Sequence, residues 1–355
     1  MLCNKDKRSN RHHVLAAITC LVWALIGASL VFSQAPPEEH RPAGPLESEV
    51  TPQLEKGIDL ALAWLAQHQG EDGSYGGMSH YGPHVGITGI AGLAFMAEGS
   101  TPGRGRYAAN VERCLEFVLS QSSESGLLAA ATSHGPMYGH GFATLFLAEV
   151  YGMTPRPEVR EALRRAVRLI AGTQNDEGGW RYQPVRSDAD ISVTVCQIMA
   201  LRAARNAGIY VDKSIIDSAT KYVKESQNPD GGFRYMLHSG GSAFARSAGA
   251  VAAMQYAGEY GSEEINRGLA YVMRFIPPQE QNVGHYFYGH YYAAQAMYLS
   301  GDENWQRWWP AVRGELLAKQ EPEGFWRNQA GDEYGTAMAL IILQMPNRLL
   351  PIFQK

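Results

Sequence analysis

Two kinds of apolar segment alternate along the chain from residue 51 onward. In the first kind, apolar residues recur at helical spacing on one side, as Leu54, Ile58 and Leu65 do, and charged residues occupy the other side. The second kind has few charges and many small residues, as in 248–253. Each glycine costs a helix roughly 1 kcal/mol relative to alanine, so close packing against neighbouring helices must offset that cost. The pattern predicts half-exposed helices alternating with buried ones.

The half-exposed segments begin at Thr51-Pro52, an N-cap followed by a proline in the first helical turn. They recur near 106–121, 157–174, 212–227, 262–276 and 303–320. The buried segments begin near residue 86 and recur near 138–152, 188–208, 248–253, 286–300 and 332–345. The chain after residue 50 therefore contains six predicted helical hairpins.

A short phrase follows most of the half-exposed segments: a glutamine, polar residues, glycine, then an aromatic residue. It occupies Gln69–Tyr75, Gln174–Trp180, Gln227–Phe233 and Gln320–Trp326, and a copy without the aromatic begins at Gln121. The first four starts along the chain are 52, 53 and 53 residues apart, and a fixed period of this size is typical of repeat architectures. We expect the glycine to make the turn, the glutamine to bind loop backbone, and the aromatic to wedge between repeats.

Six such hairpins predict an all-α fold, an α6/α6 double-ring toroid over residues 51–350. An open solenoid is the alternative, but it requires polar end repeats, and no such repeats are evident in the sequence. The net charge of −4 gives no indication of a basic surface that would bind nucleic acid. Cys114 and Cys196 are 82 residues apart; two buried thiols are expected, with a disulfide as the alternative.

The N-terminal residues predict export. Lys5, Lys7 and Arg8 precede the uncharged apolar stretch 14–32, which would span roughly 28 Å as a helix, close to a bilayer core. Residues 1–35 are therefore a signal peptide or an uncleaved membrane anchor, and both remain open because Pro36 follows the small-residue site at Ala35. Residues 36–50 form a proline-rich linker. The protein is expected outside the cytoplasm: membrane-anchored, periplasmic or extracellular.

The repeated phrases resemble the QW motifs of squalene–hopene cyclases, oxidosqualene cyclases and protein prenyltransferase β-subunits. That resemblance implies an α6/α6 toroid over residues 51–345 and an apolar lipid or other small molecule in its central cavity. The cyclases carry an Asp-x-Asp-Asp motif whose middle aspartate protonates the substrate. Here Asp188 and Asp190 match and Ile191 replaces the last aspartate, so the resemblance implies Asp190 as the proton donor. The zinc motif of the prenyltransferases is absent.

Polar and titratable residues gather where the buried helices begin, and a closed ring would bring these starts to one mouth. Asp188 and Asp190 are the catalytic candidates, either of which can instead cap a helix. The candidates for substrate binding are His84, Tyr138, His140, Arg246, Tyr288, His290, Tyr291, Tyr292 and Tyr334; His80, His134, Ser242, His285, Asp332 and Glu333 lie at similar positions. Packing between repeats is the alternative role for the tyrosines of 288–292.

Three functions compete. The first is cyclisation or isomerisation of a polyprenyl chain, begun by a protonated Asp190 and assisted by tyrosine faces that stabilise cations, with no cofactor. The second is a polysaccharide hydrolase or lyase that uses the carboxylates, or histidine, tyrosine and Arg246. The third is a non-catalytic, membrane-anchored binding or scaffolding toroid. A zinc site formed by His84, His140, His290 and Asp190 is a further hypothesis.

Overall fold

The computed structural model describes residues 49–354, except for 78, 131–134 and 279–282. Contacts divide the chain into two units, Met1–Leu46 and Glu47–Lys355, and the described residues belong to the second. The predicted leader, 1–35, and all but the last two residues of the predicted linker, 36–50, lie outside the described residues. Within the described ranges, no helix combines the length and hydropathy needed to cross a membrane.

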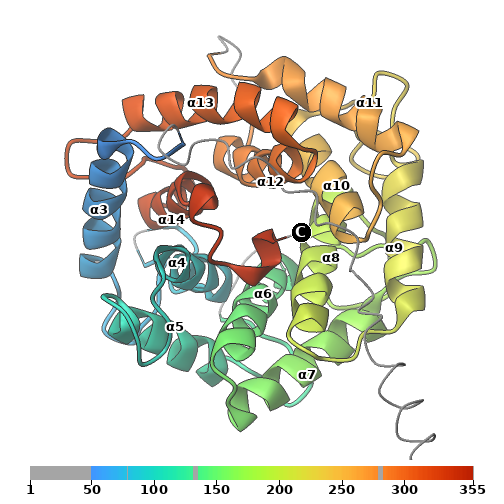
Figure 1. Ribbon diagram of the computed structural model, residues 1–355. Coiled ribbons are helices and arrows are strands. Elements are labelled where there is room, and N and C mark those ends of the chain that lie inside the picture. Colours follow the sequence, from blue (N-terminus) through green and yellow to red (C-terminus); the bar gives the residue numbers. More distant parts are fainter. Residues whose placement is uncertain (1–48, 78, 131–134, 279–282, 355) are drawn as a thin grey trace, which may run out of the picture. The chain divides into compact units, whose positions relative to one another are not determined.

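Twelve α-helices and no strand make up the described part of the chain, in two concentric rings (Figure 1). The outer ring consists of α3 (Pro52–Gln67), α5 (Ala108–Ser120), α7 (Pro157–Thr173), α9 (Lys213–Glu225), α11 (Glu263–Val272) and α13 (Asp302–Ala318). The inner ring consists of α4 (Val85–Glu98), α6 (Met137–Met153), α8 (Ile191–Asn206), α10 (Phe244–Tyr256), α12 (Tyr286–Leu299) and α14 (Asp332–Leu343). The predicted alternation of half-exposed and buried helices is confirmed.

The inner ring is closed. Each inner helix packs against the next, and α14, the last, packs against α4, the first. In the outer ring, the last helix, α13, contacts the first, α3. The α6/α6 toroid is therefore confirmed, and the open solenoid is not formed.

The repeated phrase joins neighbouring repeats. In the third repeat, the Gln174 side chain donates from Nε2 to the carbonyls of Gly178 in its own loop (2.8 Å) and Ile215 in the next outer helix (2.9 Å). Trp180 donates its indole N–H to the Ile170 carbonyl (2.8 Å), and its backbone N–H to the Thr194 hydroxyl (3.0 Å). One phrase thus binds its own outer helix, the following inner helix and the next repeat.

The same device closes the circle. Gln320 Nε2 donates to the carbonyls of Gly324 (2.9 Å) and of Gly57 in α3 (2.8 Å). Gly324 has φ +102°, and a Cβ there would lie 2.8 Å from the Leu60 carbonyl carbon, so glycine permits both the turn and the close approach. The degenerate copy at Gln121 lacks this bridge, because its Nε2 donates to the neighbouring Ser120 hydroxyl.

The inner helices touch closely, as their small residues predict. A Cβ added at Gly92 of α4 would lie 2.4 Å from the ring of Phe146 on α6. Val85 to Ala97 of α4 are all buried. Cys114 and Cys196 are also buried and unbridged, so the expectation of two buried thiols is confirmed.

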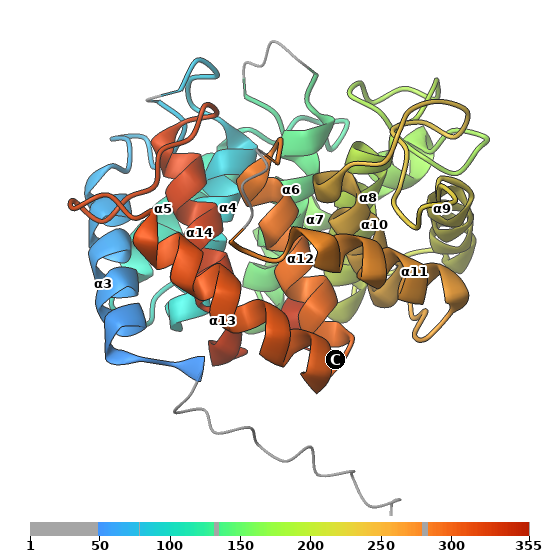
Figure 2. The same cartoon turned by 90° about the horizontal axis from the view of Figure 1, so that it is seen from above.

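The two ends of the inner ring differ. The loops that lead into the inner helices gather at one end, and the C-terminal segment lies at the other (Figure 2). There a short 3-10 helix, η3 (Pro351–Phe353), packs against α6 and α8. Ile352 donates its backbone N–H to Oε2 of Glu149, a buried carboxyl on α6 (3.3 Å). The C-terminal segment therefore closes one end of the toroid.

Candidate functional site

A cavity of about 940 Å³ occupies the end of the toroid at which the inner helices begin. Its volume lies in the range of small-molecule sites. Its wall is largely aromatic and comes from all six repeats: Tyr81, Tyr138, Phe142, Tyr182, Tyr235, Phe244, Tyr271, Phe275, Tyr288 and Tyr334. Side chains far apart in sequence thus surround one hollow, as the closed ring predicts.

The cavity wall carries one arginine and no carboxylate among the described residues. Arg246, in the first turn of α10, donates from Nε to the Phe233 carbonyl (2.9 Å) and from a terminal nitrogen to the Gly241 carbonyl (2.5 Å). Burial lowers the pKa of its guanidinium. Because no described acid forms an ion pair with it, Arg246 gives the cavity a positive charge held in place by neutral acceptors.

His84 also lines the cavity, as the N-cap of α4. Its Nδ1 accepts from the backbone N–H groups of Gly86 (3.1 Å) and Ile87 (3.4 Å). Burial lowers the pKa of its imidazole to about 4. His84 is therefore neutral near pH 7, with its proton on Nε2.

Asp190 is the N-cap of α8, which begins at Ile191 rather than near Asp188 as predicted. Its Oδ1 accepts from the backbone N–H groups of Ser192 (2.9 Å) and Val193 (3.0 Å). Its Oδ2 is buried and has no hydrogen-bond partner among the described residues. Burial raises the carboxyl pKa to about 6 against the two backbone hydrogen bonds, which lower it. The Asp190 carboxyl group therefore caps the helix and also has a raised pKa.

Asp190 does not itself line the cavity. The residue is fully buried, whereas Ser192, which donates to it, and Tyr138 belong to the wall. The charge of Asp190 helps to raise the pKa of the Tyr138 hydroxyl, second to burial. The carboxyl therefore lies directly behind the aromatic lining.

Asp188 is separate from this group. It precedes α8, its side chain is half exposed, and it forms an ion pair with Arg181. The Arg181 guanidinium lies over the rings of Tyr182 (5.3 Å) and Tyr235 (5.9 Å), whose hydroxyls contact each other. Asp188 therefore anchors an arginine beside the cavity rather than facing into it.

Four predicted ligand-binding residues lie away from the cavity. His140 is fully buried, and its Nδ1 accepts from the Leu128 N–H (3.1 Å). Tyr291 and Tyr292 are core residues, while His290 faces a different pocket. Helical geometry explains His290, because residues two apart in a helix lie about 200° apart around its axis. Tyr291 and Tyr292 are on the same side of α12 as Tyr288 but one turn farther along, where they are fully buried and the Tyr292 ring packs 4.9 Å from that of Tyr288.

The structure does not assemble the hypothetical zinc site. No group of three or more metal-ligating side chains converges anywhere in the described ranges. The predicted residues that line the cavity are His84, Tyr138, Arg246, Tyr288 and Tyr334, together with Ser242 and His285; His134 lies outside the described residues.

Several wall residues were not among the residues predicted from the sequence, and Tyr182 and Tyr235 are two of them. Each stands two positions after the aromatic residue of its phrase, Trp180 and Phe233 respectively. This shared offset was a usable signal. The residue two positions after Trp326 is Asn328, which lines the other pocket.

Two family models match the chain. The model of the squalene–hopene cyclase C-terminal domain matches residues 148–299, and that of the prenyltransferase alpha-alpha toroid domain matches residues 22–137. Drimenyl diphosphate synthase of Streptomyces showdoensis is 30% identical over 128 residues, which are 35% of this chain and 23% of that protein. The matched part is thus less than a quarter of the relative.

Solved structures share the fold at low identity. The type II terpene cyclase MstE of Scytonema, in complex with geranylgeranyl dihydroxybenzoate, has a TM-score of 0.61 at 14% identity, covering 84% of this chain and 98% of that one. An α-1,6-mannanase of Salegentibacter has a TM-score of 0.62 at 10% identity, covering 83% and 99%. The chain is thus an α-toroid repeat protein similar to squalene–hopene cyclases and prenyltransferases.

Proposed function

We propose that this protein is an exported, terpene-cyclase-like enzyme that protonates a polyprenyl chain and so starts its cyclisation or isomerisation. Asp190 is the acid. The observation that carries the proposal is the Asp190 carboxyl: one oxygen is fixed by two backbone N–H groups, and the other is buried without a described partner behind an aromatic cavity.

Asp190 has the properties of a general acid. A pKa of about 6 keeps a useful fraction of the carboxyl protonated at neutral pH. Because Oδ1 accepts two N–H groups, the proton belongs on Oδ2. Transfer of that proton to an alkene forms a C–H bond from the π electrons, leaves a carbocation on the substrate and leaves Asp190 as a carboxylate. The product cation then loses a proton to a base such as water, and the Asp190 carboxylate regains a proton from solvent, which restores both groups.

The cavity suits the cation that follows. Tyrosine faces attract cations through the ring quadrupole, by about 0.5–2 kcal/mol each, and the wall holds seven tyrosines, at least one from each of the six repeats. A prenyl chain that filled the cavity would displace water, which would otherwise quench the cation. Since Asp190 is behind Tyr138 and Ser192, the proposal requires the Tyr138 ring to move aside when substrate enters.

Arg246 provides a place for the polar end of the substrate. As the one arginine of the described wall, it favours a prenyl compound with an anionic head group over a neutral hydrocarbon. We expect Arg246→Gln to weaken binding of farnesyl diphosphate at least fivefold and binding of farnesol little, measured by isothermal titration.

Among the described residues, the cavity wall contains no carboxylate pair of the kind that a glycosidase needs. Asp332 accepts from the Asn328 backbone N–H (3.0 Å), and Glu333 accepts from the Gly76 N–H (3.1 Å); neither lines the cavity. The cavity therefore favours a cyclase over a polysaccharide hydrolase. A non-catalytic toroid differs from both in binding prenyl compounds without turnover.

The test is incubation with squalene, polyprenols and prenyl diphosphates, with products identified by mass spectrometry. Asp190→Asn keeps an N-cap but removes the acid, so turnover should fall about 10²-fold or more. Asp188→Asn is the matched control and should change turnover little. An unchanged product profile in Asp190→Asn would exclude Asp190 as the acid, and binding without products would favour the scaffolding function.

Export remains part of the proposal and rests on the basic residues and apolar stretch of the first 35 residues. A phosphatase reporter that is active only outside the cytoplasm, fused after Gln34 or after the toroid, tests it. Activity of both fusions is expected. Inactivity of both would remove export from the proposed function.

A further inference from the structure

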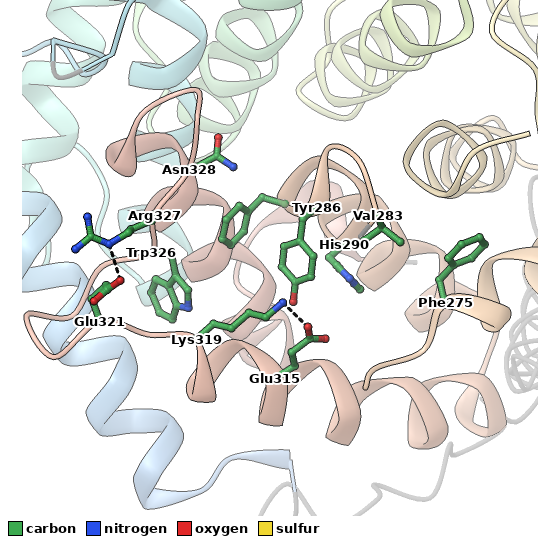
Figure 3. A pocket seen from close by; sticks show the side chains of 11 residues that line it. Phe275, Val283, Tyr286, His290, Glu315, Lys319, Glu321, Trp326, Arg327 and Asn328 are labelled. Atoms are coloured by element: carbon green, nitrogen blue, oxygen red, sulfur yellow. Dashed lines mark hydrogen bonds and ion pairs between the residues drawn. The ribbon is translucent and has the colours of Figure 1, made fainter. Parts of the chain in front are cut away.

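A second pocket of about 370 Å³ lies between α12, α13 and the loop that follows α13 (Figure 3). It shares only Phe275 and Val283 with the wall of the central cavity. Tyr286 and His290 of α12 face this pocket, whereas Tyr288 of the same helix faces the cavity. The two hollows are therefore separate sites on opposite sides of α12.

The charges of this pocket are already paired. Lys319 contacts Glu315 at 2.5 Å, and Arg327 contacts Glu321 at 2.7 Å, as the dashed lines in Figure 3 show. Two cations and two carboxylates leave no net charge. A ligand with a net charge would therefore find no unpaired group of opposite charge in the described lining.

The paired groups retain hydrogen-bonding capacity. Arg327 reaches Glu321 through Nε, so its two terminal amino groups are not used toward any described residue. A lysine ammonium has three donors, and a carboxylate has about four acceptor sites. Neighbouring hydroxyl groups of one ligand, each both donor and acceptor, match this mixture of donors and acceptors better than a purely donating or accepting molecule does.

His290 adds a buried neutral group. Burial first, and the nearby Lys319 charge second, lower the pKa of its imidazole to about 3, so the ring is neutral. Its Nδ1 is buried and has no partner among the described residues. A ligand hydroxyl that reached this nitrogen would satisfy an otherwise unpaired polar atom.

Aromatic surface completes the pocket. Tyr286, Phe287 and Trp326 line it beside the ion pairs, and the Lys319 ammonium lies 4.2 Å from the centre of the Tyr286 ring. Aromatic rings beside hydrogen-bonding groups suit a molecule with apolar C–H faces and a rim of hydroxyls.

We propose that this second pocket binds a neutral polyhydroxylated molecule the size of a monosaccharide. It is independent of the function proposed for the central cavity. A zwitterion such as an amino acid is also neutral overall, but its charges would have to displace two complete ion pairs, whereas hydroxyl groups add to them.

The experiment is isothermal titration and saturation-transfer NMR of the purified full-length protein. The probes are D-glucose, D-mannose, D-galactose and myo-inositol, with L-glutamine as the zwitterion and glucose 6-phosphate as the charged analogue. At least one neutral probe should bind with a Kd on the order of 1 mM, as expected for about twelve non-hydrogen atoms. Glutamine should bind at least tenfold more weakly, and so should the phosphate when it is measured on the Arg246→Gln variant, whose central cavity lacks its cation.

Two variants locate the site. Glu321→Gln and Lys319→Met should each weaken the sugar at least fivefold. Glu161→Gln, which removes a carboxylate from an exposed ion pair on the outer helix α7, and Arg246→Gln in the central cavity should leave its affinity unchanged. The thermal midpoint of each variant is measured first, so that misfolding is not scored as lost affinity.

Three outcomes would overturn the proposal: no binding of any neutral probe; tighter binding of glutamine, or of the phosphate in the Arg246→Gln variant whose central cavity lacks its cation; or equal affinity in the wild type and both pocket variants. Prenyl turnover is measured on the same preparations. Its presence or absence bears on the central cavity alone, so the two proposals can fail separately.

Discussion

Replacing Glu149 with glutamine should stabilise the toroid at neutral pH. Glu149 is buried at the closed end of the inner ring, where Oε2 accepts the Ile352 N–H. Burial raises the pKa of this carboxyl from 4.5 to about 8, against the hydrogen bond, which lowers it. The folded protein therefore holds a proton at pH 7 that the unfolded chain has released.

The size of the effect follows from proton linkage. Below about pH 4.5 the carboxyl is protonated in both states and costs nothing; the free energy of unfolding then decreases as pH rises toward the folded pKa of about 8. Between pH 4.5 and 7, at about 1.4 kcal/mol per unit, the loss is about 3 kcal/mol. Glutamine stays neutral and keeps an oxygen for Ile352, so the variant avoids that loss.

The assay is urea unfolding followed by circular dichroism at pH 4, 7 and 8.5, with wild type and variant compared at each pH. Other titrating groups, Asp190 among them, cancel in the difference. Glu112→Gln is the control, because its hydrogen bond and ion pair with Arg156 lower the carboxyl pKa, so that its loss should destabilise slightly at pH 7. A Glu149→Gln difference that is the same at every pH, or a less stable variant at pH 7, would refute the reasoning.

Three further predictions concern the ring and the acid. Gln320→Ala removes two hydrogen bonds to backbone carbonyls and should cost about 1–3 kcal/mol in chemical unfolding, whereas Gln121→Ala should cost less than about 0.5 kcal/mol; equal costs would contradict the bridging role. Gly324→Ala places a side chain at φ +102° against Leu60 and should lower the free energy of unfolding by about 1–3 kcal/mol. A urea midpoint at or above that of the wild type would contradict the close contact between the loop after α13 and α3. The rate of prenyl turnover should decline above about pH 6 because the Asp190 carboxyl group ionises. A rate that increases from pH 6 to 8 would indicate a different acid.

Most of the fold can be predicted from the sequence because its structural unit repeats. A glutamine, a glycine with positive φ and an aromatic recur at one period, and each copy needs the next copy to complete its contacts, as Gln174 does with Ile215. Helix ends were less certain, and α8 begins at Ile191, three residues after Asp188, since the Asp190 carboxyl caps the helix.

The residues of the central cavity can be predicted from the sequence only in part. Position near a helix start placed His84, Tyr138 and Arg246 in the cavity wall, but it could not tell which way a side chain turns. His140 and His290 are also within the first turns of inner helices, yet neither lines the central cavity. The side chains of a single helical turn point to all sides of the helix axis, so only some of them face the cavity. The second pocket depends on α12, α13 and a loop meeting in space, and no single motif signals it.

The seam between Gln320 and Gly57 has a consequence for how such a chain can change. In a linear array of repeats, one unit can be gained or lost at an end and the remainder stays intact. Here the first and last hairpins are each other's neighbours, so a chain with one hairpin fewer would present two uncovered apolar flanks instead of a smaller circle. We therefore expect this architecture to tolerate changes in its loops far more readily than changes in its number of hairpins, and to complete its fold only when the final hairpin has been made.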